Sequence, residues 1–366
     1  MLHVLSCEEC GVPELFNQSH VWLNNGDIVQ KANPRARLGF IECDDLDPLL
    51  QNIGDIFGIS VEHMIVNVIA RATAAYMNQM IPKDVRENII CKQIDPKVLA
   101  APILHYCHIV GYGKYEYLGS RYKRDADDYS KFKVTKPFSV PIVAGSIAGS
   151  LTAMILGEHE VTYKEVSTGV YEFTTSWTEY PEEMKEKIPV LPYDHRDGDI
   201  DLERCATCGG PKAFSSYRWD LDAGLVFNEQ TGRRMVVLGP EALDHLFKAL
   251  EEEIGETLPE VVVEAQRIFT KTRPHSVNEI SDENNFRTQL ALMGLGNLRQ
   301  MKIDPGGLLM RIDNAAGSLM TVGKVQGIFE LAFDKRSAIK WELSKEGDLL
   351  VEIIPLFKQF SPAASQ

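Results

Sequence analysis

Short alternations of apolar and polar residues predict a β-hairpin near the start of the chain. The segments Val21–Leu23 and Asp27–Val29 flank Asn25-Gly26, a pair that favours a tight hairpin turn because both residues tolerate positive φ angles. The triplet Asp222-Ala-Gly224 takes the same place later in the chain. Further alternating or β-branched segments predict strands at residues 131–135, 161–177, 308–312 and 338–354.

Between these segments the apolar residues recur with the period of an α-helix. In residues 258–271, five apolar side chains fall on one helical face: Val261, Val262, Ala265, Ile268 and Phe269. Helices are also predicted at residues 60–80, 96–108 and 285–294.

Two more helices are predicted to carry a glycine at every fourth residue, at Gly145 and Gly149 and again at Gly323 and Gly327. Glycine allows another backbone to approach closely, so we expect these helices to pack across a sheet or against each other. The uncharged segment 137–157 around the first pair is nearly long enough to span a bilayer. Its two prolines and small residues favour a buried helix instead, and we expect no membrane span.

The two halves of the chain repeat one pattern. Cys7-Glu-Glu-Cys10-Gly11 matches Cys205-Ala-Thr-Cys208-Gly209 at an offset of 198 residues. Four further matches follow in the same order: Gly26 with Gly224, Arg35 with Arg233, Leu46-Asp47 with Leu243-Asp244, and Gly111-Tyr-Gly113 with Gly294-Leu-Gly296. Such long-period similarity indicates a repeated structural unit.

We therefore predict an α+β protein built as an internal tandem duplication. Each copy contains a zinc-knuckle hairpin and an antiparallel sheet covered by helices. The first copy spans residues 1–178 and the second, diverged copy spans residues 205–366. Residues 179–204, rich in proline and acidic side chains, form the linker. Within it, Asp194-His195-Arg196-Asp197 is interpreted as a solvated turn.

Composition and charge limit the classes of function. The chain has 366 residues, a hydrophobic fraction of 44% and a formal net charge of −14, which suit a globular acidic protein of two domains. Clustered Lys and Arg are needed to bind nucleic acid, so we expect no nucleic-acid partner. The start of the chain has no basic and apolar signal segment, and a cytoplasmic location is expected.

The two C-x-x-C-G motifs predict a metal site. Such a turn presents two thiolates to one metal ion, and each copy carries only one turn. The natural completion is one tetrahedral site made by Cys7, Cys10, Cys205 and Cys208. Zinc is the expected ion, because closed four-cysteine sites beside hairpins are usually structural zinc sites, while iron remains the alternative. A redox role is less favoured, since redox C-x-x-C motifs normally begin a helix and hairpins follow here.

One part of the first copy resembles a known family. The resemblance runs from Gly111-Tyr-Gly113 through Pro137-Phe138-Ser139 and the glycine pair at 145 and 149 to Gly169-Val-Tyr171-Glu-Phe173, with a weaker stretch in the second copy. These motifs are similar to the 4-vinyl-reductase-type hydrocarbon-binding domain. The resemblance implies an antiparallel sheet and helices around an apolar pocket, often in a paired arrangement.

The candidate pocket residues lie around the segment 104–117. His105 and His108 are three residues apart and share a helical face, where they can bind a metal, a haem or an acidic ligand. His63, from the preceding helix, can join them. Tyr112, Tyr115 and Phe138 are candidates for an aromatic wall. The alternative interpretation is that His105 and His108 only end a helix, where positive charge suits its dipole.

Three hypotheses follow for function. The first is binding of a small apolar, aromatic or acyl molecule by a zinc-linked pseudo-dimer in a sensor or accessory role. The second is an enzyme that acts on such a molecule with His105 and His108 as an acid/base or metal site. The third is a structural subunit of a larger enzyme complex, and a protein partner or a homo-oligomer is compatible with each. The second copy lacks the histidines, so we expect that one pocket was retained and one was filled.

Overall fold

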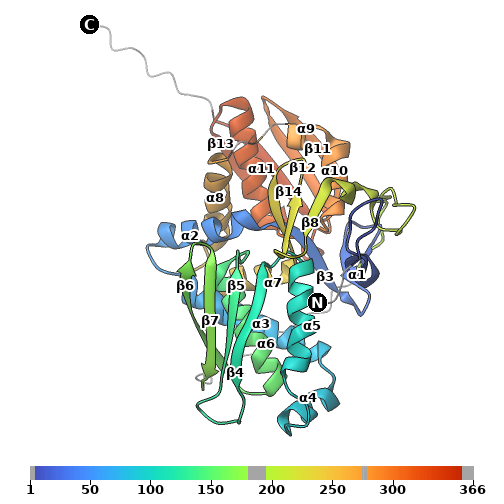
Figure 1. The fold of residues 1–366 in the computed structure, drawn as a ribbon. Helices are drawn as coiled ribbons and strands as arrows, with labels where there is room; N and C mark the ends of the chain where they lie inside the picture. Colours follow the sequence, from blue (N-terminus) through green and yellow to red (C-terminus); the bar gives the residue numbers. More distant parts are fainter. Residues whose placement is uncertain (1–4, 180–194, 274, 276–277, 357–366) are drawn as a thin grey trace.

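A computed structural model describes residues 5–179, 195–273, 275 and 278–356 of the chain (Figure 1). It contains helices and three antiparallel sheets, which confirms the expected α+β class. Among the described residues, no helix combines the length and the apolar character that crossing a bilayer requires.

The central sheet is made by both halves of the chain. Its six strands have the order β1-β2-β3-β10-β9-β8. The strands are β1 (His20–Trp22), β2 (Ile28–Gln30), β3 (Asn33–Glu42), β8 (Tyr217–Asp220), β9 (Leu225–Asn228) and β10 (Arg233–Leu238). The halves meet where β3 and β10 pair antiparallel, with Phe40 opposite Val237. Both side chains are buried, so the junction between the halves is part of the core.

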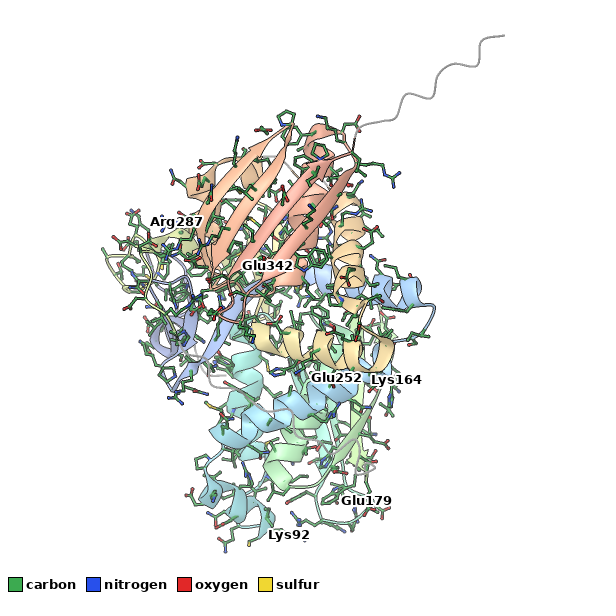
Figure 2. All side chains as sticks on the ribbon, turned by 180° about the vertical axis from the view of Figure 1, so that it is seen from behind. Lys92, Lys164, Glu179, Glu252, Arg287 and Glu342 are labelled. Atoms are coloured by element: carbon green, nitrogen blue, oxygen red, sulfur yellow. The ribbon has the colours of Figure 1, made fainter. Side chains whose placement is uncertain are left out.

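Two further sheets share one topology. The first is β4 (Lys114–Arg121), β5 (Tyr129–Thr135), β6 (His159–Ser167) and β7 (Val170–Trp177), in the order β4-β5-β7-β6. The second is β11 (Asn297–Asp304), β12 (Gly307–Asp313), β13 (Ser337–Leu343) and β14 (Leu349–Pro355), in the order β11-β12-β14-β13. The shared order supports the duplication, which itself stays a prediction. The two sheets lie at opposite ends of the molecule and face opposite sides, as the front and back views show (Figures 1 and 2).

Helices fill the space between the sheets. They are α1 (Glu14–Ser19), α2 (Leu46–Phe57), α3 (Glu62–Met80), α4 (Lys83–Ile90), α5 (Lys97–Ile109), α6 (Val140–Ile155), α7 (Pro240–Ile254), α8 (Leu258–Lys271), α9 (Asn278–Ser281), α10 (Glu283–Leu292) and α11 (Ser318–Phe333). The short 3₁₀ segments η1 (Cys43–Asp45) and η3 (Lys212–Ser216) complete the set. Helix α8 has the predicted bounds, and α3 and α5 begin and end within two residues of theirs. Helices α2 and α7 were not predicted.

Each hairpin packs on a corner of the other half. The Gly113 N–H donates to the Gly224 carbonyl at 2.9 Å, and in the same way the Gly296 N–H donates to the Gly26 carbonyl at 3.4 Å. Both turn glycines have positive φ, 82° at Gly26 and 65° at Gly224. An added Cβ would lie 2.3 Å from the Gly296 oxygen or 2.2 Å from the Gly113 oxygen, so both turns require glycine.

Tryptophans from the two outer hairpins repeat this exchange. Trp22 Nε1 donates to the carbonyl of Leu292 in α10 at 3.0 Å, and Trp219 Nε1 donates to the carbonyl of Ile109 in α5 at 3.2 Å. Because contacts of one kind run in both directions, the halves are related as the two subunits of a symmetric dimer would be.

The glycine-spaced helices α6 and α11 pack across their sheets as expected and also lie close to a second helix. At Gly149 an added Cβ would lie 2.2 Å from the carbonyl oxygen of Ala70 in α3. At Gly323 it would lie 2.4 Å from the carbonyl oxygen of Val263 in α8. Each glycine helix therefore touches the backbone of a helix in its own half, and α6 and α11 are not each other's partners at these glycines.

The substitution Gly149→Ala is expected to destabilise the protein by about 1–3 kcal/mol, because the new methyl group meets the backbone of α3. This is the net loss that remains after the roughly 1 kcal/mol that alanine gains over glycine in helix propensity. Urea unfolding measures the difference, and Ser146→Ala on the same helix is the control and should change stability by less than about 0.5 kcal/mol. An unchanged or raised unfolding midpoint for Gly149→Ala would refute the close contact.

Candidate metal centre and ligand cavity

The two C-x-x-C-G motifs form matching turns. The Cys7 N–H donates to the Val12 carbonyl at 2.9 Å, and the Gly11 N–H donates back to the Cys7 carbonyl at 2.8 Å. In the second half the Cys205 N–H donates to the Gly210 carbonyl, and the Gly209 N–H donates to the Cys205 carbonyl. The glycines that close the turns have φ of 72° and 71°, which explains the residue type after each second cysteine.

The structure brings the four cysteines of these turns together. The sulfur atoms of Cys7 and Cys205 are 3.7 Å apart, and those of Cys10 and Cys208 are 3.5 Å apart. All four sulfur atoms lie within 4.8 Å of one another. Sulfurs that share one tetrahedral ion at about 2.3 Å lie roughly 3.8 Å from each other, so the spacing fits a single metal ion. The group can therefore hold a metal, and it takes two ligands from each half.

Neighbouring residues hold the two turns against each other. Glu9 of the first turn accepts hydrogen bonds from the N–H and the hydroxyl of Thr207 in the second, at 3.1 and 2.7 Å. The Asn17 amide donates to the Cys208 carbonyl at 2.5 Å. The N–H of Cys10 lowers the pKa of the Cys7 thiol to about 7, whereas burial raises the pKa of Cys10.

A cavity of about 320 Å³ lies between the halves, beside the first four-stranded sheet. Its walls come from α3, α5, α6, the sheet, β3 and the junction of β10 with α7. The apolar and aromatic members of the wall dominate; they include Ile69, Met77, Leu104, Phe132, Phe138, Ile142, Ile147, Leu151, Met154, Val237 and Leu243. Such a volume and lining suit a small apolar molecule.

The structure divides the predicted pocket residues into two groups. Tyr112, Tyr115 and Phe138 line the cavity, and the rings of Tyr112 and Phe138 are 4.6 Å apart. His63, His105 and His108 are not among the lining residues.

The three predicted histidines lie apart from this cavity wall. His63 is exposed, with Nδ1 3.3 Å from the amide of Asn67. His108 Nε2 accepts a hydrogen bond from the Tyr115 N–H at 2.9 Å, and burial lowers the pKa of this histidine. The cavity face of α5 carries Ala100, Ile103, Leu104 and Cys107, a helical stripe, and residues 105 and 108 fall beside it.

Several lining side chains are polar, and the sequence did not single out most of them. Tyr76 donates to the Gln30 side chain at 2.6 Å, and the Tyr106 hydroxyl lies 3.0 Å from His20 Nε2. Ser146 and Ser150, four residues apart on α6, also line the cavity. Gly145 and Gly149 contact α3, and each is followed by a serine that faces the cavity. This glycine–serine pairing is the sequence signal that could have identified the lining serines.

The second half has a smaller cavity of about 160 Å³ in the matching place. Helices α6 and α11 have the same length, and their glycine pairs align, so Lys324 corresponds to Ser146 and Ile328 to Ser150. Both larger side chains line the smaller cavity. The unequal sizes agree with the expectation of one retained and one filled pocket.

Ion pairs occupy part of this second site. Glu42 accepts from Lys324 at 2.7 Å and from Arg233 at 3.1 Å, and Arg233 also lies 3.4 Å from Glu279. Burial opposes the charge on Glu42, but Lys324 and Arg233 keep the pKa of this carboxyl below its usual value. The second site therefore carries charges that already satisfy one another.

The end of the predicted linker is docked rather than solvated. Residues 180–194 lie outside the described residues, and from His195 onward the chain lies against the first hairpin. His195 Nδ1 is 2.7 Å from the carboxylate of Asp27, and Nε2 is 2.7 Å from the Pro34 carbonyl. Asp27 is fully buried and also pairs with Arg37 at 2.7 Å. The interpretation of a solvated turn was wrong at His195, which supplies a partner for a buried carboxylate, whereas Arg196 and Asp197 are exposed.

No family model and no curated protein matches the sequence. Solved structures that resemble part of the chain include a Cs H-NOX mutant with an unnatural amino acid, at 17% identity and a TM-score of 0.24, over 33% of this chain and 77% of that one. A mutant H-NOX of T. Tengcongensis matches at 16% identity and a TM-score of 0.25, over 33% of this chain and 75% of that one. At these TM-scores the similarity supports no conclusion about fold or function.

The contribution of His195 to stability is expected to depend on pH. The hydrogen bond to Asp27 raises the pKa of His195, with the Pro34 carbonyl acting in the same direction against burial and Arg37. A raised folded-state pKa means that the stabilisation is complete below about pH 6.5 and is lost as the pH rises through the folded pKa. Wild type should exceed His195→Gln in unfolding free energy by about 1 kcal/mol at pH 5.5, and by less at pH 8.5.

Urea titrations of both proteins at the two pH values measure this difference. The substitution His245→Gln is the control for the general effect of losing a histidine. A difference between wild type and His195→Gln that stays constant or grows with pH would contradict the docked, protonated histidine.

Proposed function

We propose that the protein binds one small apolar, aromatic or acyl molecule in the cavity of about 320 Å³, in a sensor or accessory role. The observation that carries the proposal is the wall of this cavity, in which aromatic and aliphatic side chains from both halves surround a space large enough for a ligand. The relationship to the 4-vinyl-reductase-type hydrocarbon-binding family is part of the same proposal, and the apolar cavity beside the glycine-spaced helix supports it. The cytoplasmic location is proposed from the sequence alone.

Binding is favoured over catalysis by the charged groups of the wall. Among the described lining residues these are Arg35, Arg37 and His245, and no carboxylate accompanies them. Arg37 is already engaged with Asp27 and with the carbonyls of Gly294 and Asn314. Tyr112, Tyr115 and Cys107 also line the wall, but burial raises the pKa of each of these groups, which makes them poor partners for proton transfer near neutral pH.

The metal at the four cysteines is proposed to be zinc in a structural role. Four sulfur ligands close a tetrahedral site and leave no position for water or substrate. Since each half supplies two ligands, the ion fixes the first turn on the second. Iron can occupy the same ligand set, and metal analysis separates the two.

Purified protein is expected to contain about one zinc ion per chain. Replacing one ligand, Cys205→Ser, should reduce the zinc content to near zero and lower the thermal midpoint by about 5 °C or more, because metal binding and folding of the turns are coupled. Elemental analysis and thermal unfolding measure both effects. The exposed cysteine variant Cys91→Ser is the control and should keep its metal. Full zinc content in Cys205→Ser, or wild type with neither zinc nor iron, would contradict the site.

The cavity proposal is tested by filling the cavity with the residue that the other half uses. Ser150→Ile copies Ile328, which the matching helix buries, so the variant should fold. We expect wild type to bind the neutral fluorescent probe N-phenyl-1-naphthylamine and Ser150→Ile to bind it at least about 10-fold more weakly, a loss of roughly 1.4 kcal/mol.

The matched control is Thr152→Ile, which adds similar bulk to the same helix at a residue that does not line the cavity. Fluorescence titration should give this variant the affinity of wild type. Equal probe binding by wild type and Ser150→Ile would place the probe elsewhere and refute the proposal. Native mass spectrometry of freshly purified protein gives the mass of any molecule that occupies the cavity.

A further inference from the structure

Two tyrosines of the cavity wall have hydroxyl groups without a protein partner. Tyr115 is only 8% exposed, and Tyr112 is half-buried; both line the cavity. Within the described part of the chain, neither phenol oxygen makes a hydrogen bond, in contrast to Tyr76 and Tyr106 on the same wall. Neither hydroxyl oxygen is among the fully buried atoms that lack a partner, so both reach accessible space beside the cavity that their residues line. A ligand atom in the cavity can therefore be their hydrogen-bond partner.

The second half shows that the fold does not need these hydroxyls. The motif Gly111-Tyr-Gly113 corresponds to Gly294-Leu-Gly296, and the following strands β4 and β11 each begin directly after it. In this alignment Leu295 corresponds to Tyr112, and Leu298 corresponds to Tyr115. Leu298 is 1% exposed, so the same structural position packs well with an aliphatic side chain.

A third polar group of the wall also has a leucine as its counterpart in the second half. Cys107, a free thiol that lines the cavity, corresponds to Leu290 in the second half, which is buried. Burial raises the pKa of the Cys107 thiol to about 12, so it remains a neutral and weak donor. At these three positions the larger cavity carries a polar group where the second half carries leucine.

The electrostatic surroundings define which ligand atom these groups suit. Burial raises the pKa of Tyr112 and Tyr115 well above the ordinary tyrosine value, so both phenols stay protonated and act as donors. Of the two arginines on the wall, Arg37 is already paired with Asp27, and Arg35 is exposed to solvent. A buried carboxylate needs a charged partner, whereas a neutral carbonyl or ether oxygen needs only a donor.

From this arrangement we infer that the ligand is a neutral molecule with an apolar, aromatic or acyl body and one carbonyl- or ether-type oxygen, which accepts hydrogen bonds from Tyr115 and Tyr112. This inference rests on the proposed function and adds the chemistry of the ligand's polar group. Until such a ligand binds, water is the available partner of the two hydroxyls.

The experiment uses two probes of nearly the same shape. Benzophenone carries a carbonyl group where diphenylmethane carries a methylene group, and calorimetric or fluorescence titration measures the affinity of the full-length protein for each. Wild type is expected to bind benzophenone more tightly. Tyr115→Phe, which removes only the hydroxyl, should weaken benzophenone binding by about 5- to 100-fold and leave diphenylmethane binding within about 2-fold.

Two further variants sharpen the comparison. Tyr115→Leu copies Leu298 and should remove the preference for benzophenone. Tyr117→Phe, on the same strand but outside the cavity wall, removes a hydroxyl that donates to Ser120, and should leave both affinities unchanged.

The possible results distinguish the role of the tyrosine hydroxyls from the proposed binding function. If both probes bind wild type equally and Tyr115→Phe changes neither affinity, the tyrosine anchor is wrong while the apolar binding site stands. If neither probe binds, and N-phenyl-1-naphthylamine also fails to bind, both the anchor and the binding function are refuted. A loss of benzophenone affinity confined to Tyr115→Phe and Tyr115→Leu supports the inference.

Discussion

The antiparallel pairing of β3 with β10 is the interaction on which the rest of the structure depends. It is centred on Phe40 and Val237, and it joins the two halves into one six-stranded sheet. Residues between Val237 and His245, at the junction of β10 with α7, complete the wall of the larger cavity, although the rest of that wall belongs to the first half. The cavity therefore exists only when the halves are paired.

The cysteine turns and the tryptophan hairpins add further contacts between the two halves. Each turn gives two sulfur atoms to a shared group, and each hairpin donates a hydrogen bond to a helix of the other half. Because the sulfur and tryptophan contacts of one half are repeated by the other, each of these two hairpins packs on the opposite half. A metal ion held by the four cysteines would restrict the separation of the two halves.

The sequence predicted the features that depend on local spacing. The C-x-x-C-G repeat predicted which four cysteines meet, and the apolar period predicted α8 at its observed bounds. The direction in which α5 presents its side chains was not predicted, so His105 and His108 were assigned to a cavity that Leu104 and Cys107 face instead. The β3–β10 pairing and the docking of His195 on Asp27 join residues far apart in sequence, and no local pattern encodes such contacts.

The covalent connection between the halves has a consequence for specialisation. In an assembly of two identical subunits, one gene specifies both binding sites, and any substitution appears twice. Here position 146 is serine while its counterpart at 324 is lysine. The first cavity therefore stays open, whereas Lys324 forms an ion pair in the second. Because both positions lie in one chain, each can carry its own residue, and the ion pairs of the second cavity leave the volume of the first unchanged.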